Sequence, residues 1–167
     1  MMRTVSKAAI LAGIWVAASL QAQADRTIEI VQELPDLSHV DLGAEGQSHG
    51  DLLAFEAPFR TEDGETGIMS GMLVTVDLET RRNVATGDAN GVFHDRFAHI
   101  VVDFGGAGSL VVAGLSHYGA QATEMTSDVP RLRAVIGGTG RFIGARGQMS
   151  TLRKDTGHYL HTITLVD

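Results

Sequence analysis

One serine lies in a pattern that carries nucleophilic chemistry in other folds. The pentapeptide Gly46–Gly50 matches Gly-x-Ser-x-Gly, in which the serine, here Ser48, is held on a sharp turn between a strand and a helix. In this chain a strand-like segment follows the pentapeptide, so the helix that would position the serine is missing. The glycines of 138–144 also lack the last spacing and the following helix of a dinucleotide-binding loop. We therefore expect neither a serine nucleophile nor a dinucleotide cofactor.

The histidines raise the question of a metal site, because the chain contains seven of them. His94 and His99 are separated by an odd number of positions, as are His158 and His161. On a strand the two members of each pair therefore point to opposite faces. The acidic residues of 62–65 are typical of a hairpin tip and lack the spacing of a calcium loop. We expect no metal and no other cofactor.

The N-terminal segment has the three parts of a secretory signal. Arg3 and Lys7 supply positive charge, Ala8–Leu20 is apolar, and Ala22–Ala24 is a small-x-small cleavage site. The apolar run is short for a membrane-spanning helix, so a retained anchor is the less favoured alternative. We expect cleavage of residues 1–24, which would leave residues 25–167 as one secreted or periplasmic domain without a membrane anchor.

The charge and the cysteine content exclude several classes of partner and chemistry. The net charge is −7, which argues against nucleic acid and against anionic membrane surfaces as partners. The chain has no cysteine, so it forms no disulfide and has no thiolate chemistry. An exported domain of this kind depends on its own hydrophobic core for stability.

The elements that must position any site are strands. Segments of alternating or β-branched apolar residues are separated by turns rich in glycine, aspartate and asparagine. About eight such segments predict an all-β fold, either a closed barrel or a sandwich, and a barrel of that size has room for one small ligand. We expect Gly119–Val129 to be irregular, with one turn of helix at most. The predicted strands are Thr27–Glu33, Leu52–Phe59, Ile68–Val76, Val92–Phe104, Leu110–Leu115, Leu132–Ile136, Phe142–Leu152 and Tyr159–Val166.

Three stretches resemble the allene oxide cyclase and dirigent proteins. Gly50–Phe55 followed by Gly67–Met72 is similar to the cyclase pattern in which a Gly-Asp-Leu strand leads into a Gly-Ile-x-x-Gly strand. The segment 104–114 is similar to a glycine-bounded hairpin of the same cyclases. Ala134–Gly147 resembles the dirigent signature Val-Val-Gly-Gly-Thr-Gly-Lys/Arg-Phe-x-x-Ala-Arg-Gly. Because its glycines suit a tight connection and Phe142 could plug the barrel end, we interpret this last motif as structural.

The resemblance covers Thr27–Val166 and implies an eight-stranded antiparallel β-barrel, a homotrimer, and a small lipophilic molecule bound in an apolar cavity. It also implies a catalytic glutamate early in the first strand. Glu33 lies nearest that place, with Glu29 as second choice. The cyclase asparagine and cysteine positions correspond to Ala57 and Leu73, and a cyclase aromatic position corresponds to Arg96. The C-terminal helix of the plant enzymes has no counterpart in the chain.

Strand parity extends these correspondences to a set of cavity residues. If Ala57 and Leu73 face inward, residues two and four positions away on the same strands do so as well. A buried Arg96 opposite Glu33 or Asp51 could orient a substrate carboxylate or stabilise developing charge, since a buried charge is costly unless it is paired. The alternative is an Arg96 on a solvated outer face. The candidate catalytic residues are Glu33, Arg96 and Asp51, and the candidate ligand-binding residues are Leu53, Phe55, Ala57, Leu73, Thr75, His94 and Tyr118.

Three functions are compatible with these residues. The favoured one is an isomerase or cyclase of the allene oxide cyclase type, which folds a reactive lipophilic intermediate into one conformer and excludes water. The second is a dirigent-like protein that sets the stereochemistry of a coupling carried out by a separate oxidase. The third is a non-catalytic barrel that binds a lipophilic ligand or serves a structural role in the periplasm.

Overall fold

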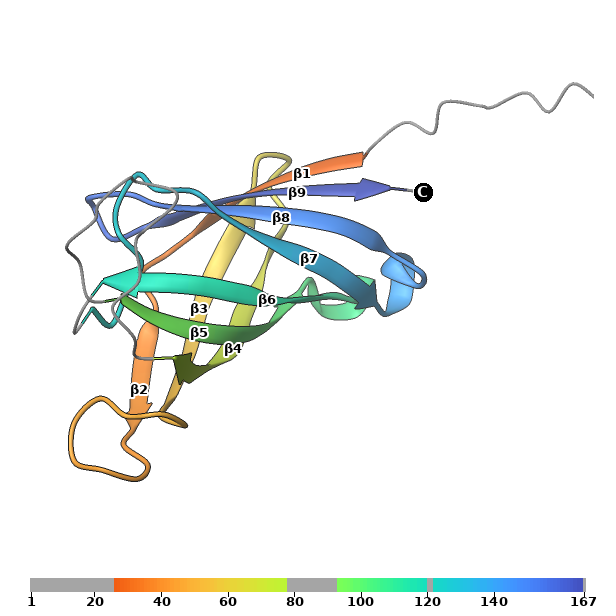
Figure 1. The fold of residues 1–167 in the computed structure, drawn as a ribbon. Coiled ribbons are helices and arrows are strands. Elements are labelled where there is room, and N and C mark those ends of the chain that lie inside the picture. Colours follow the sequence, from red (N-terminus) through yellow and green to blue (C-terminus); the bar gives the residue numbers. More distant parts are fainter. Residues whose placement is uncertain (1–25, 78–92, 120–121, 167) are drawn as a thin grey trace, which may run out of the picture.

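The computed structural model describes residues 26–77, 93–119 and 122–166 of the chain (Figure 1). The predicted signal segment and its cleavage site lie outside these residues. Within the described part, no helix has both the length and the apolar character needed to cross a bilayer.

Strands make up almost all of the described chain. They form one antiparallel sheet of nine strands, with two single turns of 3-10 helix, η1 (Gly105–Ala107) and η2 (Gly140–Phe142). The strands are β1 (Arg26–Gln32), β2 (Asp36–Val40), β3 (Leu52–Thr61), β4 (Thr66–Asp77), β5 (Phe93–Asp103), β6 (Ser109–Gly119), β7 (Arg131–Gly138), β8 (Arg146–Arg153) and β9 (Tyr159–Val166).

The sheet closes into a barrel. Its order is β1-β9-β8-β7-β6-β5-β4-β3, and β1 pairs a second time, with β3. The predicted eight-stranded antiparallel barrel is therefore confirmed. Buried positions alternate along the strands, as the side-chain period of two requires, and the core fills the inside of the barrel.

One edge of β3 is shared between two strands. The second half of β3 pairs with β1 through Phe59–Thr61, and its first half pairs with β2 through Leu52–Glu56. Between β1 and β2 the chain passes through Pro35, which has no N–H to donate to a sheet and pushes the residue before it out of helical geometry. In Figure 1, β2 follows β3 away from β9, so the barrel is closed at one end and splayed at the other.

Aromatic side chains fill the closed end. The ring centroid of Phe104 lies 5.1 Å from that of Phe59 and 5.0 Å from that of Phe142. The guanidinium of Arg141 covers both Phe104 and Phe142 and binds the Glu65 carboxylate with two hydrogen bonds. Phe142 is 2% exposed, so the structure places it as the plug that the sequence predicts.

Some element boundaries differ from the sequence prediction. The strand β2 was not predicted, because its Asp-Leu-Ser-His-Val sequence has no apolar face and lies almost wholly exposed. The segment predicted as the strand Phe142–Leu152 starts at the last residue of the 3-10 turn η2, and β8 begins only at Arg146. Gly140 in that turn has φ 57°, and a Cβ there would lie 2.5 Å from the Ala107 carbonyl oxygen, so the turn needs glycine. In the expected irregular segment, residues 122–129 contain no helical turn.

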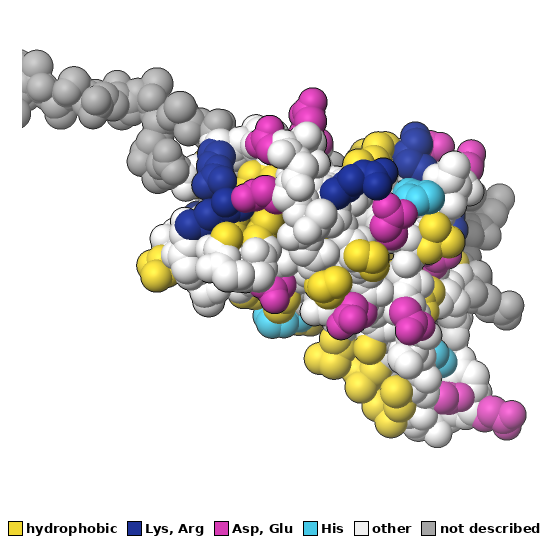
Figure 2. Space-filling model, turned by 180° about the vertical axis from the view of Figure 1, so that it is seen from behind, with side chains coloured by type: hydrophobic (Ala, Val, Ile, Leu, Met, Phe, Trp, Pro, Cys, Tyr) yellow, Lys and Arg dark blue, Asp and Glu magenta, His cyan; other side chains and the backbone are white. Residues whose placement is uncertain are grey.

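Hydrophobic side chains also lie on the outside of the barrel. Figure 2 shows one large hydrophobic group on the face that it presents, with charged side chains around it. On the outer face of β4, β5 and β6, Val74, Phe97 and Leu115 are partners in register. Phe97 and Leu115 are 45% and 48% exposed, which is a large apolar surface to leave in water.

The plug gives the first testable prediction. Replacing Phe142 with Ala removes a buried ring from the closed end and should cost about 3–5 kcal/mol of unfolding free energy, measured by urea denaturation. The adjacent Ile143→Ala is the matched control, because Ile143 is 80% exposed, and should cost no more than about 0.5 kcal/mol. Equal losses from the two variants would show that Phe142 does not close the core.

Candidate functional site

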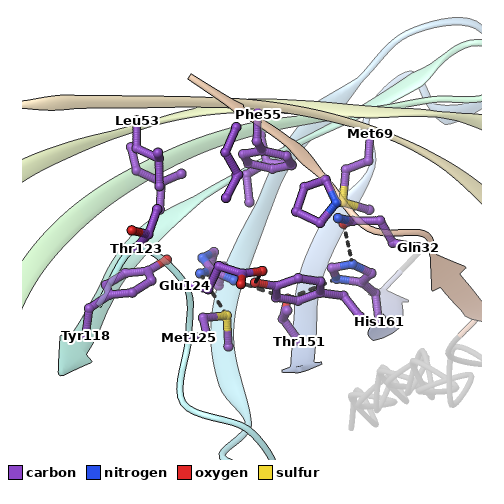
Figure 3. Close-up of a pocket in the computed structure, with 16 residues that line it drawn as sticks. Gln32, Leu53, Phe55, Met69, Tyr118, Thr123, Glu124, Met125, Thr151 and His161 are labelled. Atoms are coloured by element: carbon purple, nitrogen blue, oxygen red, sulfur yellow. Dashed lines mark hydrogen bonds between the residues drawn. The ribbon is translucent and has the colours of Figure 1, made fainter. Parts of the chain in front are cut away.

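A cavity of about 50 Å³, measured as the space open to the centre of a water molecule, lies inside the splayed end of the barrel (Figure 3). All the barrel strands contribute lining residues, and so do Pro35 and Leu37, at the break after β1 and at the start of β2. The cavity is thus a consequence of the divided edge of β3. Its two walls differ in chemistry.

The first wall is apolar and comes from β3, β4 and β5. Its members are Leu53, Phe55, Met69, Leu73 and Ile100. Phe55 is paired across the strands with Gly71, and a Cβ on Gly71 would lie 2.6 Å from the Phe55 ring. Because Gly71 has no side chain, the Phe55 ring can lie over β4, where the ring narrows the cavity.

The second wall is polar and carries a continuous chain of hydrogen bonds. Arg133 Nη1 donates to Thr151 Oγ1 over 3.1 Å, and Thr151 Oγ1 lies 3.0 Å from His161 Nδ1. His161 Nε2 lies 2.9 Å from Gln32 Oε1. Figure 3 shows Thr151 and His161 on the side of the cavity opposite Leu53 and Phe55, with Gln32 between His161 and Met69. The four residues come from β7, β8, β9 and β1, so neighbouring strands of the barrel bring them together.

The direction of this chain follows from the arginine. A guanidinium has no acceptor, so Thr151 must accept from Arg133, and its own O–H is then free to donate to His161 Nδ1. His161 is consequently protonated on Nε2 and donates to the Gln32 carbonyl oxygen. Burial lowers the pKa of His161 from 6.5 to about 3, with a smaller contribution from Arg133, so the ring is neutral. Every link thus runs from Arg133 toward Gln32.

A short segment that we call the strap, residues 122–129, covers the cavity beside this wall. Its Thr123, Glu124 and Met125 line the cavity. The Glu124 carboxylate accepts hydrogen bonds from the Tyr159 hydroxyl at 3.0 Å and from Arg153 Nη2 at 2.9 Å. These bonds hold the strap to β8 and β9. Burial, followed by the charge of Glu124, raises the pKa of Tyr159, so its phenol stays protonated and continues to donate.

Arg96 lies inside the barrel, as the inner-face interpretation predicts. It is 4% exposed, its guanidinium lies 4.6 Å from the centroid of the Tyr118 ring, and its Nη1 donates to the Thr123 carbonyl oxygen at 2.9 Å. Burial lowers the pKa of Arg96, while Tyr118 and Asp51 oppose that shift. Arg96 therefore supports Tyr118 and the strap, both of which line the cavity, without lining it itself.

The predicted acids lie away from the cavity. Since Gln32 faces inward, its neighbour Glu33 faces outward, where its carboxylate lies 3.4 Å from Arg60 Nη1 and 2.9 Å from His158 Nε2. Glu29 is also exposed and accepts a hydrogen bond from Thr162. The structure therefore brings neither glutamate to Arg96.

Asp51 has a local structural task. Its carboxylate accepts hydrogen bonds from the backbone N–H groups of Ser48 and Leu42 and from the Ser48 hydroxyl. These bonds lower the pKa of Asp51 and tie down the loop between β2 and β3. Ser48 is thereby a hydrogen-bond partner of this aspartate. Asp51 lies near enough to Arg96 for a charge interaction but does not line the cavity.

The predicted ligand-binding residues fall into three groups. Leu53, Phe55, Leu73 and Tyr118 line the cavity. Ala57 and Thr75 are buried inside the barrel but are not part of the cavity lining. The backbone of His94 pairs with Tyr118 in the sheet, and its side chain is outside the described residues. In the part of the chain that the structure describes, no group of three histidine, aspartate or glutamate side chains could hold a metal ion.

The polar wall itself was missed by the sequence analysis. Gln32, Arg133, Thr151 and His161 are 2–5% exposed and occupy inward positions of their strands. A signal was present, because arginine or histidine replaces an apolar residue at alternate positions of Arg131–Val135 and Tyr159–Ile163. Which of these positions meet could not be known without the strand order.

Comparison with known proteins supports the fold. No family model matches the chain, and no curated protein matches it. Among solved structures, a pyocyanin demethylase has a TM-score of 0.61 at 15% identity, with 86% of this chain and 100% of that chain covered. A pterocarpan synthase dirigent protein has a TM-score of 0.53 at 14% identity, with 93% and 96% covered. The chain has the dirigent-type barrel fold. A Diels-Alderase from Streptomyces koyangensis has a TM-score of 0.54 at 12% identity, with 90% of this chain and 72% of that chain covered. At these identities the likeness concerns the fold, and the barrel expected from the family resemblance is confirmed at that level.

The buried histidine gives a prediction about acid stability. The unfolded chain binds a proton at His161 near its ordinary pKa of 6.5, whereas the folded chain binds it only near 3. The stability that neutral His161 contributes is thus complete above pH 6.5. It is lost as the pH falls from 6.5 toward about 3, by up to about 1.4 kcal/mol per pH unit. The unfolding free energy of the wild type minus that of His161→Gln should therefore shrink between about pH 7 and pH 4.5. A difference that stays constant with pH would mean that His161 is charged or exposed when folded.

Proposed function

We propose that the chain is a cyclase-like barrel, an isomerase or cyclase that folds a small lipophilic intermediate inside the cavity. One observation carries this proposal: the cavity sets an apolar wall of β3, β4 and β5 against a wall of fixed hydrogen-bond donors. Small-molecule sites are usually built in this way, with apolar lining for affinity and a few polar groups for orientation. Two facing walls of opposite character would hold an amphipathic molecule in one orientation.

The ionisation states of the lining groups favour chemistry without strong acid–base catalysis. His161 stays neutral and is already hydrogen-bonded at both ring nitrogens. The pKa of Tyr118 is raised, chiefly by burial, and Glu124 is engaged by Tyr159 and Arg153. His161 is therefore not placed to take up a proton near neutral pH. A ring closure directed by substrate conformation and by exclusion of water needs no such group.

The polar wall could also lower a barrier by electrostatics. Donors that are fixed before the reaction stabilise oxygen atoms on which negative charge develops, and they do so most strongly where water is excluded. Arg133 and the amide of Gln32 are candidates for this role, since both line the cavity. In this proposal Arg96 is a positioning residue, which holds Tyr118 and the strap.

A non-catalytic binding protein is the second candidate. The cavity volume of about 50 Å³ favours a non-catalytic barrel with a largely structural role, because ligand sites commonly measure about 300–1,000 Å³. A substrate larger than a few atoms would need the strap to move or would leave part of its length outside the splayed end. Release of the strap depends on the Glu124 contacts with Tyr159 and Arg153.

An assay of stereochemistry separates the two candidates. An allene oxide generated in solution cyclises spontaneously to a racemate, so a protein that folds the substrate should produce an excess of one enantiomer. Chiral chromatography of the cyclopentenone, with and without the purified chain, measures that excess. A product that stays racemic while the protein binds the lipophile would favour the non-catalytic candidate. Formation of an excess only when a separate oxidase generates radicals from a phenol would point to the dirigent-like function.

We also propose that the chain forms a homotrimer, in which the outer apolar surface of Val74, Phe97 and Leu115 is covered by another copy. Replacing Phe97 with Glu should then yield monomers at micromolar concentration in native mass spectrometry. The matched control is Glu56→Gln on the outer face of β3, which should leave the mass unchanged. A wild-type chain that is monomeric under the same conditions would refute the trimer.

Two neighbouring residues of β4 provide a test of the cavity itself. Leu73 lines the cavity, whereas Met72 is exposed on the outside. Leu73→Trp should fill the space and weaken binding of 1-octanol at least about tenfold, because an overfilled core has no room for a ligand. Met72→Trp should leave that binding within about twofold of the wild type. Isothermal titration calorimetry measures both, and equal effects of the two variants would place the ligand elsewhere.

A further inference from the structure

The inner face of the barrel carries an excess of positive charge around the cavity. Arg96, Arg131 and Arg133 are 4%, 7% and 5% exposed. The Tyr118 side chain lies among them, since the charges of all three act on its pKa. Within the described residues, no carboxylate forms an ion pair with Arg131 or Arg133, and the Glu124 carboxylate is bound by Arg153 instead. A buried cation without a counter-ion is costly, so this arrangement lowers the stability of the empty barrel.

The two arginines of β7 also have unused donors. Arg131 Nε and Arg133 Nε are buried and have no hydrogen-bond partner. A buried donor that nothing satisfies destabilises the fold, and the cost is larger when the donor is charged. Arg133 lines the cavity, so a ligand there would lie beside its guanidinium group. Its Nη2 has the weakly accepting Met125 Sδ as a partner, at 3.9 Å. The cavity therefore offers a positive charge that no carboxylate of the described residues neutralises.

A glycine on the neighbouring strand gives Arg133 its place. Gly114 of β6 occupies an inward position between Val112 and Ser116, both of which are buried. A Cβ on Gly114 would lie 3.2 Å from Arg133 Cγ and 3.3 Å from its Cα and Cβ. Contacts of this length are tight, so glycine at this position leaves space for the stem of the arginine to cross the inside of β6.

The hydrogen-bond chain orients a further donor. Because each link runs from Arg133 through Thr151 and His161 to the Gln32 carbonyl oxygen, the amide NH2 of Gln32 is left to donate elsewhere. Gln32 lines the cavity and is 3% exposed. The polar wall thus ends in donors at both extremities, namely the guanidinium of Arg133 and the amide of Gln32. Acceptor groups of a ligand would satisfy both.

From these contacts we propose that the ligand of the cavity is a lipophilic molecule with an anionic oxygen, a carboxylate or a phenolate. Arg133 binds that oxygen. The Gln32 amide donates a hydrogen bond to an acceptor on the polar part of the same molecule, and the Leu53 and Leu73 side chains contact its apolar part. The proposal rests on the function proposed above and specifies its substrate class. A hydrogen bond between a guanidinium and an anionic oxygen is about twice as strong as one between neutral groups.

The first experiment compares head groups on one chain length. Octanoate, octane-1-sulfonate, 1-octanol and octylammonium are titrated into the purified full chain by isothermal titration calorimetry. We expect octanoate to bind at least about tenfold more tightly than 1-octanol, and octylammonium not to bind. Equal affinity for octanoate and 1-octanol would overturn the anionic class but would leave a lipophilic cavity, and so the proposed function, intact. Failure of all four to bind would count against both.

The sulfonate distinguishes general anion binding from carboxylate geometry. Octane-1-sulfonate has three acceptor oxygens in a tetrahedral arrangement, whereas a carboxylate presents two in a plane that suits the guanidinium fork. Binding of both anions above 1-octanol supports recognition of charge at Arg133. Preference for octanoate over the sulfonate supports two-point recognition by the guanidinium. Tighter binding of octylammonium than of either anion would refute the assignment.

The second experiment uses an uncharged replacement of similar length. Arg133→Met should lower octanoate affinity at least about tenfold and leave 1-octanol affinity within about twofold. Its melting temperature should be equal to or above that of the wild type, because an uncompensated buried charge is removed. The matched control is Arg60→Met on the outside, where Arg60 is 63% exposed, and it should change neither affinity.

Stability separates ligand binding from a purely structural role of the arginine. If Arg133→Met melts well below the wild type and binds octanoate as tightly as before, Arg133 serves the fold and the proposal is wrong. Gln32→Leu provides an independent measure, since it removes the amide without touching the charge. It should weaken octanoate by a smaller factor than Arg133→Met does. An octanoate affinity unchanged by both variants would likewise overturn the proposal.

Discussion

The rest of the structure depends on how the edge of β3 is divided. An eight-stranded barrel has no free edges only if the two strands at the ends of the sheet order, here β1 and β3, pair along their full length. Here β1 pairs with β3 over three residue pairs and then gives way, at Pro35, to β2. The pairing is enough to close one end, where aromatic rings fill the interior. At the other end β1 and β2 diverge, and the space between the walls becomes a cavity instead of core.

The two sides of the divided edge also line the cavity with side chains of different polarity. The strands that continue past the break on the β3 side present leucine, methionine and phenylalanine, whereas those on the β9 side present glutamine, histidine, threonine and arginine. Arg133 can only donate, so it imposes one direction on every hydrogen bond between Thr151 and Gln32. A buried network that is fully satisfied would rigidify the barrel, but this one leaves Arg133 Nε without a partner. The unsatisfied donor lowers the stability of the folded domain, and a bound ligand that accepts its hydrogen bond would restore that stability.

The sequence predicted what depends on local periodicity and missed what depends on strand order. The alternation of apolar residues predicted a barrel or a sandwich, and the family resemblance indicated the barrel. Parity, applied to the positions that the resemblance supplied, put Leu53 and Leu73 inside it, and the burial of Arg96 agrees with the first of its two alternatives. The same alternation puts Glu33 outside once Gln32 is inside, so the glutamate that lies nearest the cyclase position is on the outer face. Strand β2 escaped detection because an exposed edge strand needs no apolar face. His161, Thr151 and Arg133 lie on three different strands, and nothing local in the sequence indicates that they meet.

The central claim is that a lipophilic molecule binds between the two walls at the splayed end. Methyl-resolved NMR of the full chain, titrated with octanoate, tests this claim most directly. We predict that the methyl signals of Leu53, Leu73 and Ile100 shift together and saturate, while those of Leu110 and Ile163 in the closed end stay in place. Shifts centred on Leu110 and Ile163, or confined to exposed methyl groups such as those of Leu115 on the outer face, would contradict it.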